Sequence, residues 1–189
     1  MTSSTTPPRW AKLVLDEAIN ALEDFRATGA DPANRGFWDR VLFYPGLHAV
    51  WGYRFSRILW LRGHRFMARG VSHLIRRATL IEIHPGAEIK GGLFIDHGEG
   101  CVIGETSVVG RGVRLFHGVT LGGVGESRHE RRHPILGDEV LVGAKASILG
   151  PVVIGARAKI GAGAVVLSDV GDDETAVGVP AKVVRRRGE

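Results

Sequence analysis

A histidine that directly follows an aspartate is the residue of this chain best suited to acid–base chemistry. The pair is Asp96 and His97, within a glycine-containing segment that ends at Gly100. A neutral imidazole is the commonest general base near physiological pH when a carboxylate orients it and stabilises its protonated form. Glu82, 15 residues before His97, is a candidate for that carboxylate. We predict that His97 is a general base with Glu82 as its partner; the alternative is an ordinary surface loop.

Arg132 and His133 form a second polar pair. The planar guanidinium of arginine can hold a carboxylate through two parallel hydrogen bonds. Arg132 could therefore bind a substrate carboxylate if a base lies nearby, whereas a solvated loop is the alternative. Asp31, which precedes a proline, either ends a helix or binds a substrate ammonium group.

A metal site and a thiol nucleophile are two further alternatives. Four histidines could in principle converge on a metal ion, as in the gamma-class carbonic anhydrases: His97, His117, His129 and His133. Their spacing does not decide this, but we favour a site without metal, and we read His84 and His117 as packed or turn residues. Cys101 is more simply a small buried residue than an acyl carrier.

Composition narrows the function classes. Of the 189 residues, 44% are apolar and 24% are charged, so the chain can bury a core. The net charge of +5 is too small to indicate nucleic-acid binding, although a basic surface could receive a coenzyme with several phosphates. No apolar run reaches the roughly 18 residues of a membrane span, and the first residues do not resemble a signal peptide. A single cysteine fits a reducing compartment, so we expect a cytoplasmic protein that binds neither nucleic acid nor membrane.

Glycine divides the chain into two parts. Six of the 27 glycines lie before residue 80 and 21 lie from Gly86 onward, whereas all four tryptophans lie in the first third. Before the boundary, apolar residues recur at helical spacing in three stretches, residues 10–25, 47–59 and roughly 65–77. We predict a small helical domain over residues 1–80.

After the boundary, an aliphatic residue recurs every six positions. The positions in register are Ile83, Ile89, Ile95, Ile103, Val109, Leu115, Leu121, Leu136, Val142, Ile148, Ile154, Ile160 and Val166. If each hexad forms a short strand and a turn, three hexads form one triangular coil, and stacked coils pair their strands in parallel around a buried apolar column. Hexads of this kind resemble those of a left-handed parallel β-helix. We predict this fold over residues 81–170, followed by a tail over 171–189.

Two breaks in the six-residue register mark candidate functional sites. Ile95 and Ile103 are eight residues apart, which places two extra residues around His97, and Leu121 and Leu136 are fifteen apart. The second break predicts a protruding loop over residues 122–134. Insertions in a solenoid tend to carry binding function because the coils themselves only pack. Both breaks contain histidine, so we place the site there.

Short strings along the chain resemble one enzyme family. In order, they are Asp31-Pro-Ala, Tyr44-Pro-Gly-Leu-His-Ala49, Ile83-His-Pro-Gly-Ala87, Phe94-Ile-Asp-His-Gly98, Val102-Ile-Gly-Glu-Thr106, Gly118-Val-Thr-Leu-Gly-Gly123, Arg132-His-Pro134, Gly143-Ala-Lys-Ala146 and Gly178-Val-Pro-Ala181. Over about residues 30 to 184 they resemble the serine O-acetyltransferases, hexapeptide-repeat enzymes that begin cysteine biosynthesis. The hexads and Gly-Glu-Thr alone would indicate only hexapeptide acyltransferases, so another hydroxyl or amine acceptor is an alternative.

The resemblance implies a role for each matching residue. His97 matches the base that takes the proton from the serine hydroxyl as it attacks acetyl-CoA, and Glu82 stands where many members have the orienting aspartate. The positions that match the serine pocket are Asp31, Asp96, Arg132 and His133, with Glu105 as a supporting carboxylate. The coenzyme groove between neighbouring β-helices is expected along Gly123, Gly143, Ala144, Lys159 and Ala162.

The resemblance also implies partners. We expect L-serine and acetyl-CoA as substrates, feedback binding of L-cysteine, and a homotrimer or a dimer of trimers, because the coenzyme groove needs a second β-helix wall. Charged residues in the loop 122–134 depart from the family pattern and could alter coenzyme entry or cysteine inhibition. The chain ends in Arg-Arg-Arg-Gly-Glu rather than in the isoleucine by which many members bind cysteine synthase, so we expect no strong complex of that kind.

Overall fold

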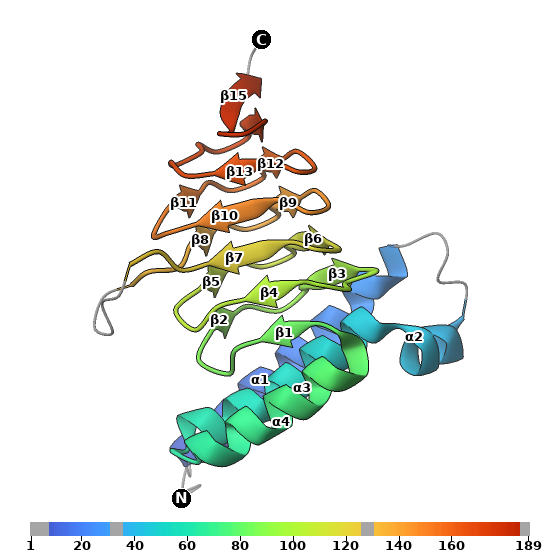
Figure 1. Ribbon diagram of the computed structural model, residues 1–189. Coiled ribbons are helices and arrows are strands. Elements are labelled where there is room, and N and C mark those ends of the chain that lie inside the picture. Colours follow the sequence, from blue (N-terminus) through green and yellow to red (C-terminus); the bar gives the residue numbers. More distant parts are fainter. Residues whose placement is uncertain (1–7, 31–35, 126–130, 186–189) are drawn as a thin grey trace, which may run out of the picture.

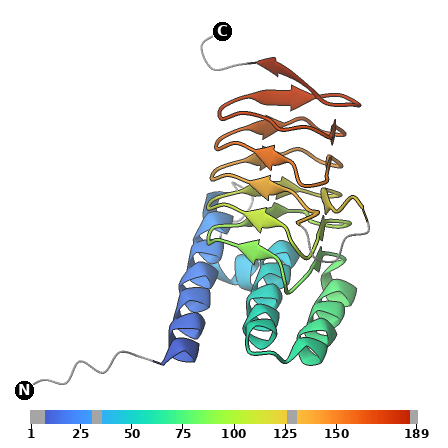
Figure 2. The ribbon, with the colours of Figure 1, turned by 90° about the vertical axis from the view of Figure 1, so that its left-hand side faces the viewer.

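Helices precede a three-sided stack of short strands in the computed structural model, which describes residues 8–30, 36–125 and 131–185 (Figures 1 and 2). The helices are α1 (Arg9–Ala27), a 3-10 turn η1 (Thr28–Ala30), α2 (Phe37–Phe43), α3 (Pro45–Leu61) and α4 (Arg65–Thr79). The apolar spacing predicts α1, α3 and α4. It misses α2, because a helix of seven residues is too short to establish a period.

Successive coils place their strands in three sheets of parallel strands. The five-stranded sheet holds β1 (Glu82–Ile83), β4 (Val102–Ile103), β7 (Thr120–Gly122), β10 (Ser147–Leu149) and β13 (Val165–Val166). The four-stranded sheet holds β2 (Glu88–Ile89), β5 (Val108–Val109), β8 (Ile135–Leu136) and β11 (Val153–Ile154). The six-stranded sheet holds β3 (Phe94–Asp96), β6 (Arg114–Phe116), β9 (Leu141–Val142), β12 (Lys159–Ile160), β14 (Thr175–Val177) and the antiparallel β15 (Lys182–Arg185). The predicted left-handed parallel β-helix after a helical region is confirmed.

The hexad residues form the core of the stack. Every aliphatic residue in the six-residue register, from Ile83 to Val166, is at most 4% exposed. Each such side chain contributes roughly 1.5–3 kcal/mol through burial, and the column continues through every coil. Strand pairing also extends past residue 170, since β14 pairs in parallel with β12.

Buried charges attach the helices to the first coil. Arg54 on α3 contacts Asp24 and Glu17 on α1 and donates to the carbonyl oxygens of Ile89 and Lys90. The fully buried side chains of α1 are therefore charged, and its apolar stripe is only partly covered. Glu17 and Asp24 are its buried side chains, whereas Trp10, Val14 and Leu22 of the stripe are exposed. The guanidinium on α3 draws the two carboxylates inward.

The first register break is a compact turn. His97, Gly98 and Gly100 all have positive φ angles, of 58°, 73° and 77°. The Gly100 amide donates to the Leu80 carbonyl one coil earlier, so the extra residues bulge outward without interrupting the stack. Within the described residues, none of the helices has the length and apolarity needed to cross a bilayer.

Candidate active site

The predicted site residues lie along two different edges of the three-sided stack. The first, which we call the His97 edge, consists of the turns from the six-stranded to the five-stranded sheet: residues 97–101, 117–119, 143–146 and 161–164. The second, the His133 edge, includes the turns from the five-stranded to the four-stranded sheet at residues 84–87, 104–107 and 123–134 where described. The five-stranded sheet separates the two edges.

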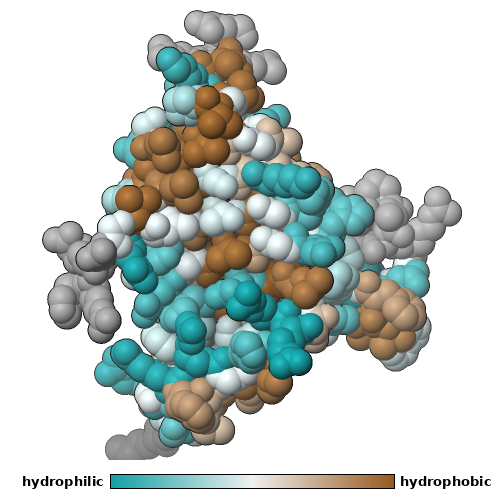
Figure 3. All heavy atoms as spheres, in the orientation of Figure 1, coloured by the Kyte–Doolittle hydropathy of each residue, from teal (hydrophilic) through white to brown (hydrophobic). Residues whose placement is uncertain are grey.

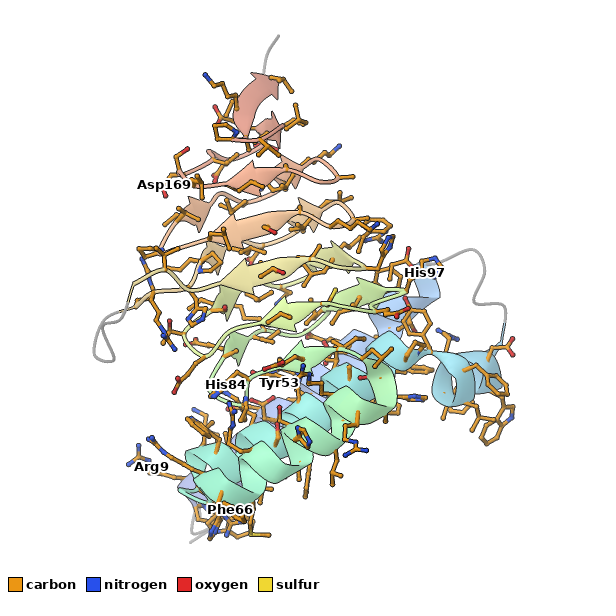
Figure 4. All side chains as sticks on the ribbon, in the orientation of Figure 1. Arg9, Tyr53, Phe66, His84, His97 and Asp169 are labelled. Atoms are coloured by element: carbon orange, nitrogen blue, oxygen red, sulfur yellow. The ribbon has the colours of Figure 1, made fainter. Side chains whose placement is uncertain are left out.

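His97 projects from its edge into solvent (Figure 4). Its side chain is 80% exposed, and its Nε2 lies 3.8 Å from Oδ1 of Asp96, the last residue of β3. The ring of His117, one coil further along, stands edge-on at 6.3 Å between centroids. The sequence analysis interprets His117 as a packed or turn residue, because its position beside His97 depends on the stacking of coils. A solvent-facing imidazole with a carboxylate nearby is accessible to a substrate proton.

Glu82 lies in the first strand of the coil that ends at the His97 turn. Its strand pairs with β4, which follows the His97 turn. The carboxylate forms an ion pair with Arg76 of α4, with Oε2 at 3.2 Å from Nε, and both side chains are partly exposed. The pairing of Glu82 with His97 remains a prediction.

Three of the expected coenzyme residues stack on the His97 edge. Gly143 and Ala144 follow β9, Ala162 follows β12, and the Gly163 amide donates to the Ala144 carbonyl at 2.8 Å. A Cβ on Gly143 would lie 2.6 Å from the Ala162 nitrogen, so only glycine fits there. Lys159 of β12 is exposed beside this stack, whereas Gly123 lies on the other edge.

The His133 edge brings together Glu105, Gly123, Arg132 and His133. His133 is 6% exposed, and its Nδ1 accepts the Thr106 amide at 3.3 Å. Burial lowers the pKa of His133, the charge of Arg132 lowers it further, and the charge of Glu105 opposes them. The His133 imidazole is therefore neutral near pH 7.

His84 belongs to the same edge, one coil before Glu105. Burial is the main cause that lowers its pKa to about 4, against the opposing charge of Glu105. Its Nδ1 accepts the Gly86 amide at 3.0 Å, and its ring packs edge-on against Trp60. This confirms a packed histidine at this position and places the carboxylate of Glu105 within the influence of two imidazoles.

Hollows in one chain do not coincide with the predicted site. One of about 540 Å³ is lined by His73, Arg76, Arg77, Leu80, Glu99 and Gly100, and another of about 240 Å³ by Trp60, Arg65, Gly86, Glu88, Glu105, Thr106, Ser107 and Val108. The first includes Glu99 and Gly100 of the His97 turn, and the second includes Glu105 and Thr106 of the His133 edge.

Two predictions fall outside the described residues. Asp31 is one, and most of the charged segment of the loop, residues 126–130, is the other. Among the residues that the structure does describe, there is no group of three or more His, Cys, Asp or Glu side chains that could hold a metal ion.

Comparison with known proteins assigns the fold to one family. The model for the bacterial transferase hexapeptide (six repeats) matches residues 133–168. Serine acetyltransferase of Helicobacter pylori is 52% identical over 161 residues, covering 85% of this chain and 94% of the relative. The chain belongs to the serine acetyltransferase family. The predicted resemblance and the predicted reaction class, acetyl-CoA-dependent acyl transfer, are confirmed.

Other serine acetyltransferases extend the match. The Bacillus subtilis enzyme is 48% identical over 159 residues, covering 84% of this chain and 73% of the relative. The crystal structure of the Neisseria gonorrhoeae enzyme superposes with a TM-score of 0.88 at 38% identity, covering 95% of this chain and 70% of that chain. Solved serine acetyltransferases that resemble this chain include complexes with serine, cysteine and CoA. The comparisons support this reading and not the carbonic anhydrase alternative.

Cys101 has no place in the chemistry expected of a serine acetyltransferase. It is 1% exposed, and its Sγ lies 3.1 Å from the Phe116 carbonyl oxygen. Burial raises the pKa of this thiol to about 11, so the reactive thiolate is scarce near neutral pH. Cys101 is a core residue, as the sequence indicates.

Proposed function

We propose that this chain transfers the acetyl group of acetyl-CoA to the hydroxyl of L-serine, in a site that two copies of the chain build together. The observation that carries the proposal is the division of the family's serine-pocket residues between two edges. His97 and Asp96 lie on one, and Arg132 and His133 lie on the other. A cyclic trimer that sets the His97 edge of one copy against the His133 edge of the next completes a site at each contact.

The chemistry follows from the position of His97. Its imidazole accepts the proton of the serine hydroxyl as the oxygen attacks the thioester carbonyl carbon and the new C–O bond forms. When the tetrahedral intermediate collapses, the C–S bond breaks and the protonated imidazole returns its proton to the leaving thiolate. Glu82 orients the ring and stabilises its charge. General base catalysis of this kind contributes about 10²–10⁴-fold, and holding the two substrates together contributes more.

The other edge holds the amino acid. Arg132 binds the serine carboxylate, His133 donates a hydrogen bond to it or to the reacting oxygens, and Glu105 supports the pair. Asp96 and Asp31 bind the ammonium group. The pantetheine arm of the coenzyme lies along Gly143, Ala144 and Ala162, with Gly123 of the next copy opposite and Lys159 near a phosphate.

An apolar surface on α2 supports association between copies. Phe37, Trp38, Leu42 and Phe43 are each more than half exposed, and Figure 3 shows the hydrophobic surface that they form. Tyr44, which follows α2, stacks on Phe94 of β3, the strand that carries Asp96. Exposed aromatic groups of this size usually mark an interface, and this one lies on the same side of the molecule as His97.

The test of the reaction is thiol release from acetyl-CoA across a panel of acceptors: serine, homoserine, threonine, a sugar and an amine. We expect release that depends on serine and a product identified as O-acetyl-L-serine by mass spectrometry. Faster release with another acceptor would make this chain a different hexapeptide acetyltransferase.

The test of the shared site mixes two inactive variants. Co-expressed His97→Ala and Arg132→Ala chains give trimers in which about one site in four combines an intact His97 with an intact Arg132. We therefore expect activity to return to about a quarter of the wild-type value. No recovery in the mixed trimers would place the whole site within one chain.

Further parts of the proposal concern regulation and organisation. Since a serine acetyltransferase that resembles this chain has been solved with cysteine, we propose that L-cysteine competes with serine at the Arg132 pocket. A cytoplasmic location and a division into residues 1–80, 81–170 and 171–189 belong to the same proposal. A competition assay with L-cysteine at several serine concentrations tests the first of these.

A further inference from the structure

One hydroxyl group on the His133 edge touches both members of the Arg132–His133 pair. Oγ1 of Thr106 accepts the backbone N–H of Arg132 at 3.2 Å and lies 2.9 Å from Nδ1 of His133. Arg132 and His133 follow Thr106 by 26 and 27 positions in the sequence. Oγ1 of Thr106 thus links both Arg132 and His133, the expected serine-pocket pair, to the preceding coil.

The Thr106 contacts determine which nitrogen of His133 carries a proton. The backbone N–H of Thr106 can only donate, and it points at Nδ1 at 3.3 Å, so Nδ1 is the acceptor. The Thr106 hydroxyl then shares the lone pair of this nitrogen as a second donor while it accepts the Arg132 amide, which uses the one O–H and one of the two lone pairs of the hydroxyl. In a neutral imidazole, the proton therefore lies on Nε2.

Two glycines leave room for the ring in this orientation. A Cβ on Gly104 would lie 2.0 Å from Nε2 of His133, and a Cβ on Gly123 would lie 3.0 Å from it. A side chain at Gly104 would therefore displace the imidazole. The ring occupies the space that the absent side chain leaves, with Thr106 on its Nδ1 side.

The same contacts close the base of the long loop. The Val124 amide donates to the Arg132 carbonyl at 3.1 Å, and the Arg132 amide donates to Thr106. The backbone of Arg132 is thereby bonded on both sides, to the start of the loop and to the coil below. A change at Thr106 would move Arg132 as well as His133.

We propose that Thr106 is a positioning residue that holds Arg132 and His133 in one arrangement and presents Nε2 of His133 to serine as a hydrogen-bond donor. This rests on the proposed function, because the value of the arrangement depends on serine as the acceptor. His133 is then a donor and not a second base, which leaves proton abstraction to His97. Thr106 itself does not touch the substrate.

The kinetic test compares Thr106→Val, which removes the hydroxyl at similar volume, with Thr106→Ser, which retains it. We expect Thr106→Val to raise the KM for serine roughly ten- to a hundredfold, since small misplacements of binding groups are costly, with the KM for acetyl-CoA nearly unchanged. Thr106→Ser should stay within about threefold of wild type. The matched control is Thr120→Val, because the strand register aligns Thr120 with Val102, and valine already occupies that position.

An activity-independent test reads the tautomer of His133 directly. In two-bond ¹H–¹⁵N spectra of histidine-labelled protein, with His133→Asn for assignment, we expect Nδ1 unprotonated and Nε2 protonated in wild type and Thr106→Ser. Thr106→Val retains the backbone N–H that points at Nδ1 and should therefore also keep Nδ1 unprotonated, so that its effect on the serine KM reports the lost hydroxyl and not a changed tautomer. If wild type carries its proton on Nδ1, or if Thr106→Val leaves the serine KM within twofold while folding normally, the proposal is wrong. Equal loss in Thr106→Ser would show that packing matters rather than the hydroxyl. A correct tautomer in a protein that does not acetylate serine would overturn the proposed function alone.

Discussion

Arg54 and Asp24 meet through two hydrogen bonds, with Nε at 2.9 Å from Oδ2 and Nη2 at 3.2 Å from Oδ1. Arg54 is 3% exposed and Asp24 is 0% exposed. Oδ1 of Asp24 also accepts the amides of Gly92 and Leu93 in the first coil. Burial raises the pKa of Asp24, whereas Arg54 and the two amides oppose that shift. One ion pair thus connects α1, α3 and the β-helix.

Removing one partner of this pair should destabilise the protein strongly. Arg54→Met leaves the Asp24 carboxylate buried without its counter-charge, a change that typically costs about 3–5 kcal/mol. Calorimetry at fixed protein concentration should show a much lower Tm. The control is Arg157→Met, which breaks the exposed pair of Arg157 with Asp173 and should leave the Tm nearly unchanged. Equal Tm values for the two variants would contradict a structural role for the buried pair.

Replacing His97 should remove catalysis and leave the fold intact. His97 is exposed and contributes nothing to the apolar column, so His97→Ala should keep its Tm and its oligomeric state. We expect serine-dependent thiol release to fall by about 10²–10⁴-fold. His64→Ala, which removes an exposed histidine between α3 and α4, should behave as wild type. Activity above a tenth of wild type in His97→Ala would exclude it as the base.

Comparing variants of Glu82 and Arg76 separates a structural role of Glu82 from a catalytic role that it exerts through His97. Glu82→Gln and Arg76→Met both break the same ion pair, which is partly exposed and contributes at most about 1 kcal/mol. If Glu82 orients His97, only Glu82→Gln should lower kcat, by roughly tenfold or more, with the KM for serine unchanged. Equal kinetic effects in the two variants would show that Glu82 acts through Arg76 alone.

Arg132→Lys tests how the substrate carboxylate is held. Lysine keeps the charge but loses the planar two-pronged fit, so the KM for serine should rise by about ten- to a hundredfold, or roughly 1–3 kcal/mol. The KM for acetyl-CoA should hardly change. If instead the KM for acetyl-CoA rises and the KM for serine does not, Arg132 binds a phosphate of the coenzyme and the serine pocket lies elsewhere.

His84 should make the protein less stable in mild acid. Its pKa is about 4 in the folded chain, mainly because of burial, against about 6.5 when unfolded. The unfolded state therefore binds more protons between these values, and stability that is complete above pH 6.5 declines as the pH falls toward 4. The Tm of wild type should drop between pH 7 and pH 5 more than the Tm of His84→Asn. An identical drop in both would assign the acid sensitivity to other groups.

The hexad period by itself determined the β-helix. A period of six fits neither a helix nor an alternating strand, and each residue in register from Ile83 to Val166 is buried, because one inward side chain per strand is a local requirement. The register breaks likewise located the His97 turn and the loop before His133, since an insertion changes the count of residues wherever it falls.

Only the tertiary structure decided which side chains share an edge. His97 and His133 each lie within a register break, yet they lie on opposite sides of the five-stranded sheet, because the edge that a turn occupies depends on how many strands precede it in its coil. Thr106 contacts His133, which is 27 residues away in the sequence. Arg54 binds Glu17 and Asp24, so the face of α1 that is buried most deeply is not the one that its apolar spacing predicts. Such contacts join segments that are distant in sequence. Their energies depend on burial and on the charges of residues elsewhere in the chain, which the local spacing of residues does not reveal.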